Sequence, residues 1–148
     1  MERISIACDH HGIKIKGKII DYLTHKGYEI IDYGVNDSNP ADYPNLAFEI
    51  ANSIVSEEST KGILICYTGI GMSIACNRFK KVRCARVVNT SDVKHARLDN
   101  DVNVIAFSSQ LPTYKVYDML DVFLTTAFSN LERHQRRIDL LDKDFEND

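Results

Sequence analysis

The chain has 148 residues, of which 44% are hydrophobic and 26% are charged, with 18 basic and 21 acidic side chains and a formal net charge of -3. This length and composition are typical of one globular domain, so we expect residues 1–148 to form a single domain. The slight acidity argues against a nucleic-acid coat, no apolar run reaches the roughly 20 residues of a membrane span, and the N-terminus lacks a secretory signal. We therefore expect a soluble, cytoplasmic protein with neither nucleic-acid nor membrane partners.

The cysteines and histidines are the residues through which a chain of this size most often gains a disulfide or a metal. Cys8, Cys66, Cys76 and Cys84 contain no Cys-x-x-Cys pair and are too sparse for the disulfide framework of a small secreted domain. No histidine falls at a zinc-ligand spacing with a cysteine. We therefore expect reduced thiols, no bound metal, no cofactor, and chemistry performed by side chains alone.

Short apolar runs alternate with segments of helical periodicity along the chain. The runs that predict strands are residues 4–8, 28–33, 62–66, 82–88 and 102–107. The segments that predict helices are residues 13–23, 46–55, 72–80, 90–98 and 116–127, followed by a last, highly charged helix that begins near Leu131. A loop rich in Asn, Asp, Ser and Pro is expected over residues 34–44, and N-cap chemistry for the fourth helix is expected from residues 90–92.

Strands that are separated by helices cannot be hairpin partners, so we expect them to pair in parallel through right-handed crossovers. The predicted fold class is α/β: a three-layer α/β/α sandwich on a Rossmann-like five-stranded parallel sheet, with a C-terminal helical extension. In such sheets ligands bind beyond the carboxyl ends of the strands, where the strand order reverses. A site is therefore expected among residues 9–12 and 66–73, which follow the first and third strands.

A glycine-rich turn, residues 69–71, leads into the third predicted helix with Thr68 and Ser73 beside it. The exposed N–H groups of such a turn suit an anion. A dinucleotide fingerprint would have a third glycine where Ile74 stands and would follow the first strand, so an NAD site is disfavoured. The alternative is a turn that merely closes a βα unit.

Cys66 ends the third strand immediately before this turn, where neighbouring N–H dipoles favour a thiolate. It is therefore a candidate base or nucleophile, the alternative being a small buried hydrophobic residue, which is our interpretation of the other three cysteines. Asp9 and His10 follow the first strand and would project over the same edge, where they could bind sugar hydroxyls. The alternative for His10 and His11 is a solvated loop pair.

Two arginines, Arg133 and Arg137, are four residues apart in the last helix and therefore share one of its faces. Guanidinium groups at this spacing could hold a phosphate through paired hydrogen bonds. The alternative, which composition favours, is a solvated basic turn that balances the acidic C-terminal tail.

Five motifs occur in order along nearly the whole chain: Cys8-Asp9-His10, Asp42-Tyr43-Pro44, residues 65–75, residues 100–104, and Arg133-His134-x-x-Arg137. Together they resemble the type B ribose-5-phosphate isomerases and their galactose-6-phosphate isomerase relatives. The resemblance implies a metal-free aldose–ketose isomerase of the pentose phosphate pathway that interconverts ribose 5-phosphate and ribulose 5-phosphate through an enediolate. A six-carbon sugar phosphate is the alternative substrate, and a non-catalytic sugar-phosphate binding module is the alternative of another class.

The resemblance also implies roles for individual residues and for a second subunit. Cys66 would take the proton, while Thr68 and the N–H groups of residues 67–71 would hold the developing oxyanion. Because the family builds its sites between two subunits, a homodimer or a dimer of dimers with shared active sites is expected. The implied substrate-binding residues are Asp9, His10, Tyr67, Thr68, Gly69, Ile70, Gly71, Ser73, Asn100, Gln110, Arg133 and Arg137.

Three positions depart from the family's pattern. Tyr67 stands where the family commonly has glycine, and Gln110 stands where it often has a phosphate-binding arginine. Asp99 stands where many members have a histidine assigned to opening the sugar ring, and it is our third candidate catalytic residue. A carboxylic acid is ordinarily ionised at neutral pH and is then a poor acid, so ring opening could instead fall to Asp9 or His10, or the substrate could enter open.

Overall fold

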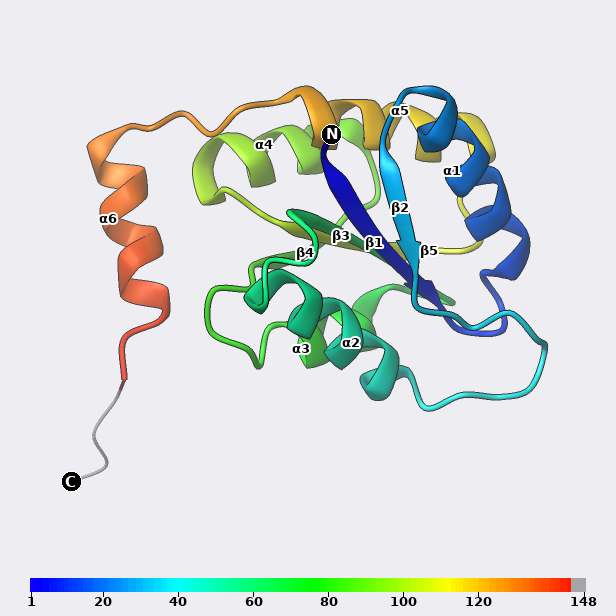
Figure 1. Ribbon diagram of the computed structural model, residues 1–148. Coiled ribbons are helices and arrows are strands. Elements are labelled where there is room, and N and C mark those ends of the chain that lie inside the picture. Colours follow the sequence, from blue (N-terminus) through cyan, green and yellow to red (C-terminus); the bar gives the residue numbers. More distant parts are fainter. Residues whose placement is uncertain (145–148) are drawn as a thin grey trace.

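The computed structural model describes residues 1–144 (Figure 1). Its strands form one parallel sheet in the order β2-β1-β3-β5-β4, so the predicted α/β/α fold and C-terminal helix are confirmed. The elements are β1 (Arg3–Cys8), α1 (Ile13–His25), β2 (Glu29–Asp32), α2 (Tyr43–Val55), β3 (Lys61–Cys66), α3 (Ile70–Cys76), β4 (Cys84–Arg86), α4 (Thr90–Asn100), β5 (Val104–Ser108), α5 (Thr113–Thr125) and α6 (Glu132–Leu141).

Helices cover both faces of the sheet: α2 and α3 lie on one face, and α1, α4 and α5 lie on the other (Figure 1). Successive side chains of β3 therefore enter two different cores. Ile63 and Ile65 pack with α1 and α5, whereas Leu64 and Cys66 pack with α2 and α3. Burial on both faces explains why this strand is a continuous apolar run rather than an alternating one.

The C-terminal helix α6 stands apart from the sandwich, beyond α4 and β4 (Figure 1). Its only buried residue is Ile138, and its remaining side chains are exposed or half-buried. Among residues 1–144, none of the helices has both the length and the apolar character needed to span a bilayer.

The predicted loop before α2 and the predicted cap of α4 need correction. Helix α2 begins at Tyr43 with Pro44 in its first turn, so the preceding loop is shorter than predicted; proline is favoured there because its missing N–H has no helical partner to lose. The N-cap of α4 is Asn89, whose side chain accepts a hydrogen bond from the Asp92 N–H at 2.8 Å. The cap therefore lies one residue before the predicted segment 90–92.

Helix α3 and strand β4 are both shorter than predicted. The helix ends at Cys76, and the Asn77 side chain then bonds both backbone groups of Cys84, accepting from its N–H at 2.7 Å and donating to its carbonyl at 2.8 Å. Strand β4 retains three residues and lies at one end of the strand order, where it pairs with β5.

Candidate functional site

The turn between β3 and α3 adopts a backbone conformation that glycine alone adopts readily. Gly69 has φ of 81°, and a Cβ atom there would lie 2.8 Å from the Cα of Phe107 and 2.9 Å from its nitrogen. The Gly69 N–H donates to the Cys66 sulfur at 3.0 Å, and the Ile70 N–H donates to the Thr68 hydroxyl at 3.1 Å. The turn therefore directs an amide hydrogen at the thiol, a contact that stabilises negative charge on sulfur.

A cavity of about 210 Å³ opens beside this thiol. It lies where the strand order reverses between β1 and β3, as the sequence predicts. Although Cys66 is only 6% exposed, its side chain lines the cavity, so a small ligand can reach the sulfur. The lining residues are Asp9, Tyr43, Cys66, Tyr67, Thr68 and Gly71.

Two of the other cysteines, Cys8 and Cys84, lie in surroundings that disfavour a thiolate. All four are free thiols. Burial raises the pKa of Cys8 to about 11, and a hydrogen bond from Cys76 together with burial raises the pKa of Cys84 well above its ordinary value. Both thiols therefore stay protonated at neutral pH, which leaves Cys66 as the cysteine that combines access to a cavity with an N–H partner.

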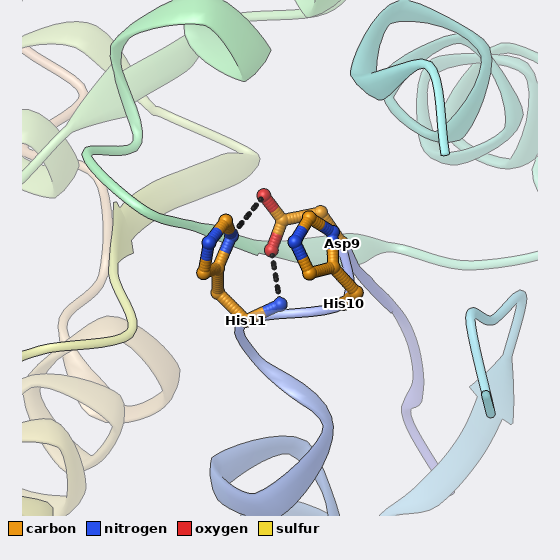
Figure 2. Close-up of side chains that lie close together, drawn as sticks. All are labelled: Asp9, His10 and His11. Atoms are coloured by element: carbon orange, nitrogen blue, oxygen red, sulfur yellow. Dashed lines mark hydrogen bonds and ion pairs between the residues drawn. The ribbon is translucent and has the colours of Figure 1, made fainter. Parts of the chain in front are cut away.

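Asp9, His10 and His11 cluster directly after β1 (Figure 2). The Asp9 carboxylate accepts the His11 backbone N–H at 2.9 Å and lies 3.3 Å from its ring Nδ1, and the two imidazole rings are 3.9 Å apart. Within residues 1–144, these three side chains form the group able to approach one metal ion, with one ligand atom from each within 4.8 Å of the others. The same side chains suit the hydroxyl groups of a sugar.

Gln110 and Ser73 lie at the same carboxyl edge of the sheet. Ser108, at the end of β5, donates to the Tyr67 carbonyl at 2.6 Å and accepts the Gln110 N–H at 3.0 Å, so Gln110 is fastened beside the turn. The Ser73 hydroxyl instead donates to the Ile70 carbonyl at 2.7 Å, inside the first turn of α3.

The remaining predicted site residues lie at the opposite edge of the sheet. Helix α4 ends at Asn100, whose carbonyl accepts from the Arg83 side chain at 3.0 Å, next to the start of β4. A larger cavity of about 440 Å³ lies there, with Asn100 in its lining. Asp99 is joined to α6 through His134, whose Nε2 lies 3.8 Å from the carboxylate.

The two arginines of α6 complete this second group. Arg133 and Arg137 are both exposed, and Figure 1 shows α6 on the far side of the molecule from the end of β1. The predicted site residues of one chain therefore fall into two separate sets. We call the residues around Cys66 the Cys66 cluster, and Asp99, Asn100 and the arginines of α6 the arginine group.

Tyr43 lines the cavity but was not among the predicted site residues. Its ring covers the turn so closely that a Cβ at Gly71 would lie 2.7 Å from the Tyr43 Cε1. The signal for it was present in the sequence, because Tyr43 belongs to the Asp-Tyr-Pro motif that contributed to the family resemblance.

The fold and site define a doubly wound α/β protein with a polar ligand site at the switch point of its sheet. The chain belongs to the ribose/galactose isomerase family, whose model, described as "Ribose/Galactose Isomerase", matches residues 4–141. It is accordingly a sugar-phosphate isomerase by family.

Similar proteins of known name or structure support the assignment of the chain to this family. The chain is 35% identical over 142 residues to ribose-5-phosphate isomerase B of Escherichia coli, covering 95% of each chain. A Rickettsia bellii relative, named only at the level of a sugar phosphate isomerase, is 40% identical over 136 residues, covering 91% of this chain and 94% of the relative. The crystal structure of a Thermotoga maritima ribose 5-phosphate isomerase superposes with a TM-score of 0.91 at 37% identity, covering 95% of this chain and 97% of that one.

Proposed function

We propose that this protein interconverts ribose 5-phosphate and ribulose 5-phosphate. The observation that carries the proposal is the Cys66 thiol, which faces a small cavity, accepts an amide N–H and has the Asp9 carboxylate on the same cavity wall. The names of the Escherichia coli and Thermotoga maritima relatives support the choice of a five-carbon sugar.

The reaction begins with the open-chain aldose in the cavity. The Cys66 thiolate takes the proton from C2, and the electron pair of that bond forms the C1–C2 double bond while negative charge moves to O1. The Thr68 hydroxyl and the N–H groups of residues 67–71 stabilise this enediolate. The hydroxyl proton of O2 then passes to O1, and the thiol returns its proton to C1, which gives the ketose.

The direct test is turnover of ribose 5-phosphate by the purified protein, followed by the appearance of ribulose 5-phosphate. Galactose 6-phosphate is assayed in parallel, because one extra carbon changes binding by only about 1 to 3 kcal/mol and the protein's family includes isomerases of both sugars. Turnover of the six-carbon sugar alone would contradict the proposed substrate. Binding without turnover of either sugar would contradict the proposed catalysis.

We propose further that the arginine group completes the site of a second copy of the chain. A strand of 5 to 6 residues spans roughly 17–20 Å, which is longer than a five-carbon sugar phosphate. A substrate held at Cys66 therefore cannot reach the opposite edge of the same sheet, where Asn100 lies. A homodimer that places α6 of one copy over the Cys66 cluster of the other would bring the Cys66 cluster and the arginine group to one substrate.

Replacing Arg137 with alanine is expected to raise KM for ribose 5-phosphate by about 10- to 100-fold, because hydrogen bonds to a charged group contribute roughly 1.5–3 kcal/mol. Steady-state kinetics measure the effect. Arg136→Ala is the matched control, since Arg136 is also exposed on α6 but its side chain leaves the helix roughly 100° around the axis from that of Arg137. An unchanged KM in Arg137→Ala would reject its phosphate role.

Mixing two impaired variants, assayed at a substrate concentration below the parental KM, tests the shared site. Cys66→Ala and Arg137→Ala chains, refolded together in equal amounts, are expected to recover about a quarter of the parental activity, because half of the dimers are hybrids with one intact site of two. Each variant refolded alone is the control. If the mixture is no more active than the two variants measured separately, then both groups serve the same chain and the shared site is wrong.

A further inference from the structure

His11 is a site-edge residue that the mechanism above does not use. Its ring is held against Asp9, and its centroid lies 5.3 Å from that of Tyr67. Since both Asp9 and Tyr67 line the cavity, the imidazole lies next to two of its lining residues.

The proposed reaction requires a chemical step that Cys66 does not perform. An aldose with five carbons and a 5-phosphate closes into a ring through O4, and C2 becomes acidic only when C1 is an open carbonyl. Ring opening removes the proton from O1 and adds one to O4. A group that accepts and then returns a proton near neutral pH suits this step, and imidazole is the side chain with that property.

The contacts of His11 fix which ring nitrogen can act. Both Asp9 oxygens are engaged: Oδ1 accepts the His11 backbone N–H, and Oδ2 faces Nδ1 (Figure 2). A carboxylate accepts only, so Nδ1 carries the hydrogen and the lone pair is left on Nε2. A carboxylate that orients an imidazole in this way is the arrangement that prepares a histidine base in other enzymes.

The two side chains of this pair differ in their exposure to solvent. The Asp9 side chain is 12% exposed, whereas the His11 side chain is 40% exposed. The carboxylate is thus fixed in the protein, and the ring it orients remains open to a ligand that enters the cavity.

The alternative groups for ring opening are less well placed. Asp99 lies in the arginine group, 46% exposed, with His95 and His134 each 3.8 Å away, so no side chain of residues 1–144 holds its carboxylate at hydrogen-bonding distance. Nδ1 of His10 is buried without a partner in residues 1–144, and no carboxylate in that part of the chain orients its ring.

We propose that His11, oriented by Asp9, opens the sugar ring; this inference rests on the proposed function. Nε2 takes the proton from O1, the C1–O1 double bond forms as the C1–O4 bond breaks, and the imidazolium returns the proton to O4. O1 and O4 are both attached to C1, so one imidazole reaches both atoms. The step moves one proton from O1 to O4 and leaves the enzyme unchanged.

The test compares His11→Asn with the parent enzyme. Asparagine retains a side-chain N–H for Asp9 but cannot shuttle a proton, so kcat/KM for ribose 5-phosphate is expected to fall by about 100-fold. With 2-deuterated ribose 5-phosphate, the isotope effect is expected to fall toward 1, because ring opening becomes slower than removal of the C2 proton. For a four-carbon aldose 4-phosphate, which cannot close a five-membered ring, the rate is expected to stay near that of the parent.

His25→Asn is the matched control, because His25 is an exposed histidine at the end of α1 whose ring bonds the Asp21 carbonyl at 2.9 Å. Full activity of His11→Asn toward ribose 5-phosphate would overturn the inference. Equal losses on both sugars, or an isotope effect that keeps its parental value while the rate falls, would also overturn it. A parent enzyme that isomerises no sugar phosphate would contradict the proposed function instead.

Discussion

Replacing Cys66 with alanine is expected to lower kcat for ribose 5-phosphate by about 10²- to 10⁴-fold, the usual contribution of a positioned general base. The reason is that, among the residues lining the cavity, Cys66 supplies the one thiol, and the Gly69 N–H donates to its sulfur. The alanine fits the space without difficulty, because it only removes the sulfur. Steady-state kinetics, together with circular dichroism to confirm the fold, measure the effect.

Cys84→Ala is the matched control for this variant. Cys84 belongs to β4 at the other edge of the sheet, and its raised pKa keeps it protonated at neutral pH. We expect the control to retain parental turnover. A Cys66→Ala protein that folds and still isomerises the sugar would remove the thiol from the mechanism.

Replacing Gly69 with alanine is expected to reduce both stability and activity. A non-glycine residue at φ of 81° is strained, and its Cβ would press on the backbone of Phe107, so the free energy of unfolding is expected to fall by roughly 2 to 5 kcal/mol. The turn can relieve this contact only by moving the N–H groups that face the substrate, which is expected to cost about 10²- to 10³-fold in kcat. Urea unfolding and kinetics on the same sample measure the two effects.

Gly17→Ala is the opposite case and serves as the control. Gly17 lies inside α1, is exposed, and has no heavy atom within 4 Å of an added Cβ. Alanine there is expected to stabilise the protein by about 0.5 to 1 kcal/mol, because it favours the helical backbone. If Gly69→Ala behaves like Gly17→Ala, the turn does not depend on its left-handed glycine.

The sheet was predictable from the sequence because its strands are buried on both faces. A run such as Ile63-Leu64-Ile65 has no polar position to face solvent, so strand and helix patterns separate clearly along the chain. Boundaries set by distant contacts were less predictable. Helix α3 ends just before Asn77, whose side chain hydrogen-bonds the backbone of Cys84, seven residues further on. No local sequence pattern predicts that contact.

The composition of the site was predictable, but its division into two groups was not recognised. The family motifs identify residues by their position in the sequence, and they do not indicate at which edge of the sheet each residue lies. The alternation of elements does contain that information: a residue such as Asn100, which ends a helix before a parallel strand, lies at the amino edge of the sheet. The Asp9–His11 contact required the folded turn, since neighbouring residues can equally point apart.

The loose attachment of α6 has a consequence for how the protein tolerates mutation. At Gly69 the turn after Cys66 packs backbone against backbone, so a larger side chain at this position disturbs the folded core. Ile138 is the one buried residue of helix α6, so the exposed positions of this helix can vary at little cost in folding free energy. In the proposed site, selection can thus adjust how α6 binds the anionic end of a substrate while the proposed proton-transfer chemistry stays unaltered, which gives such a chain a direct route to new substrates.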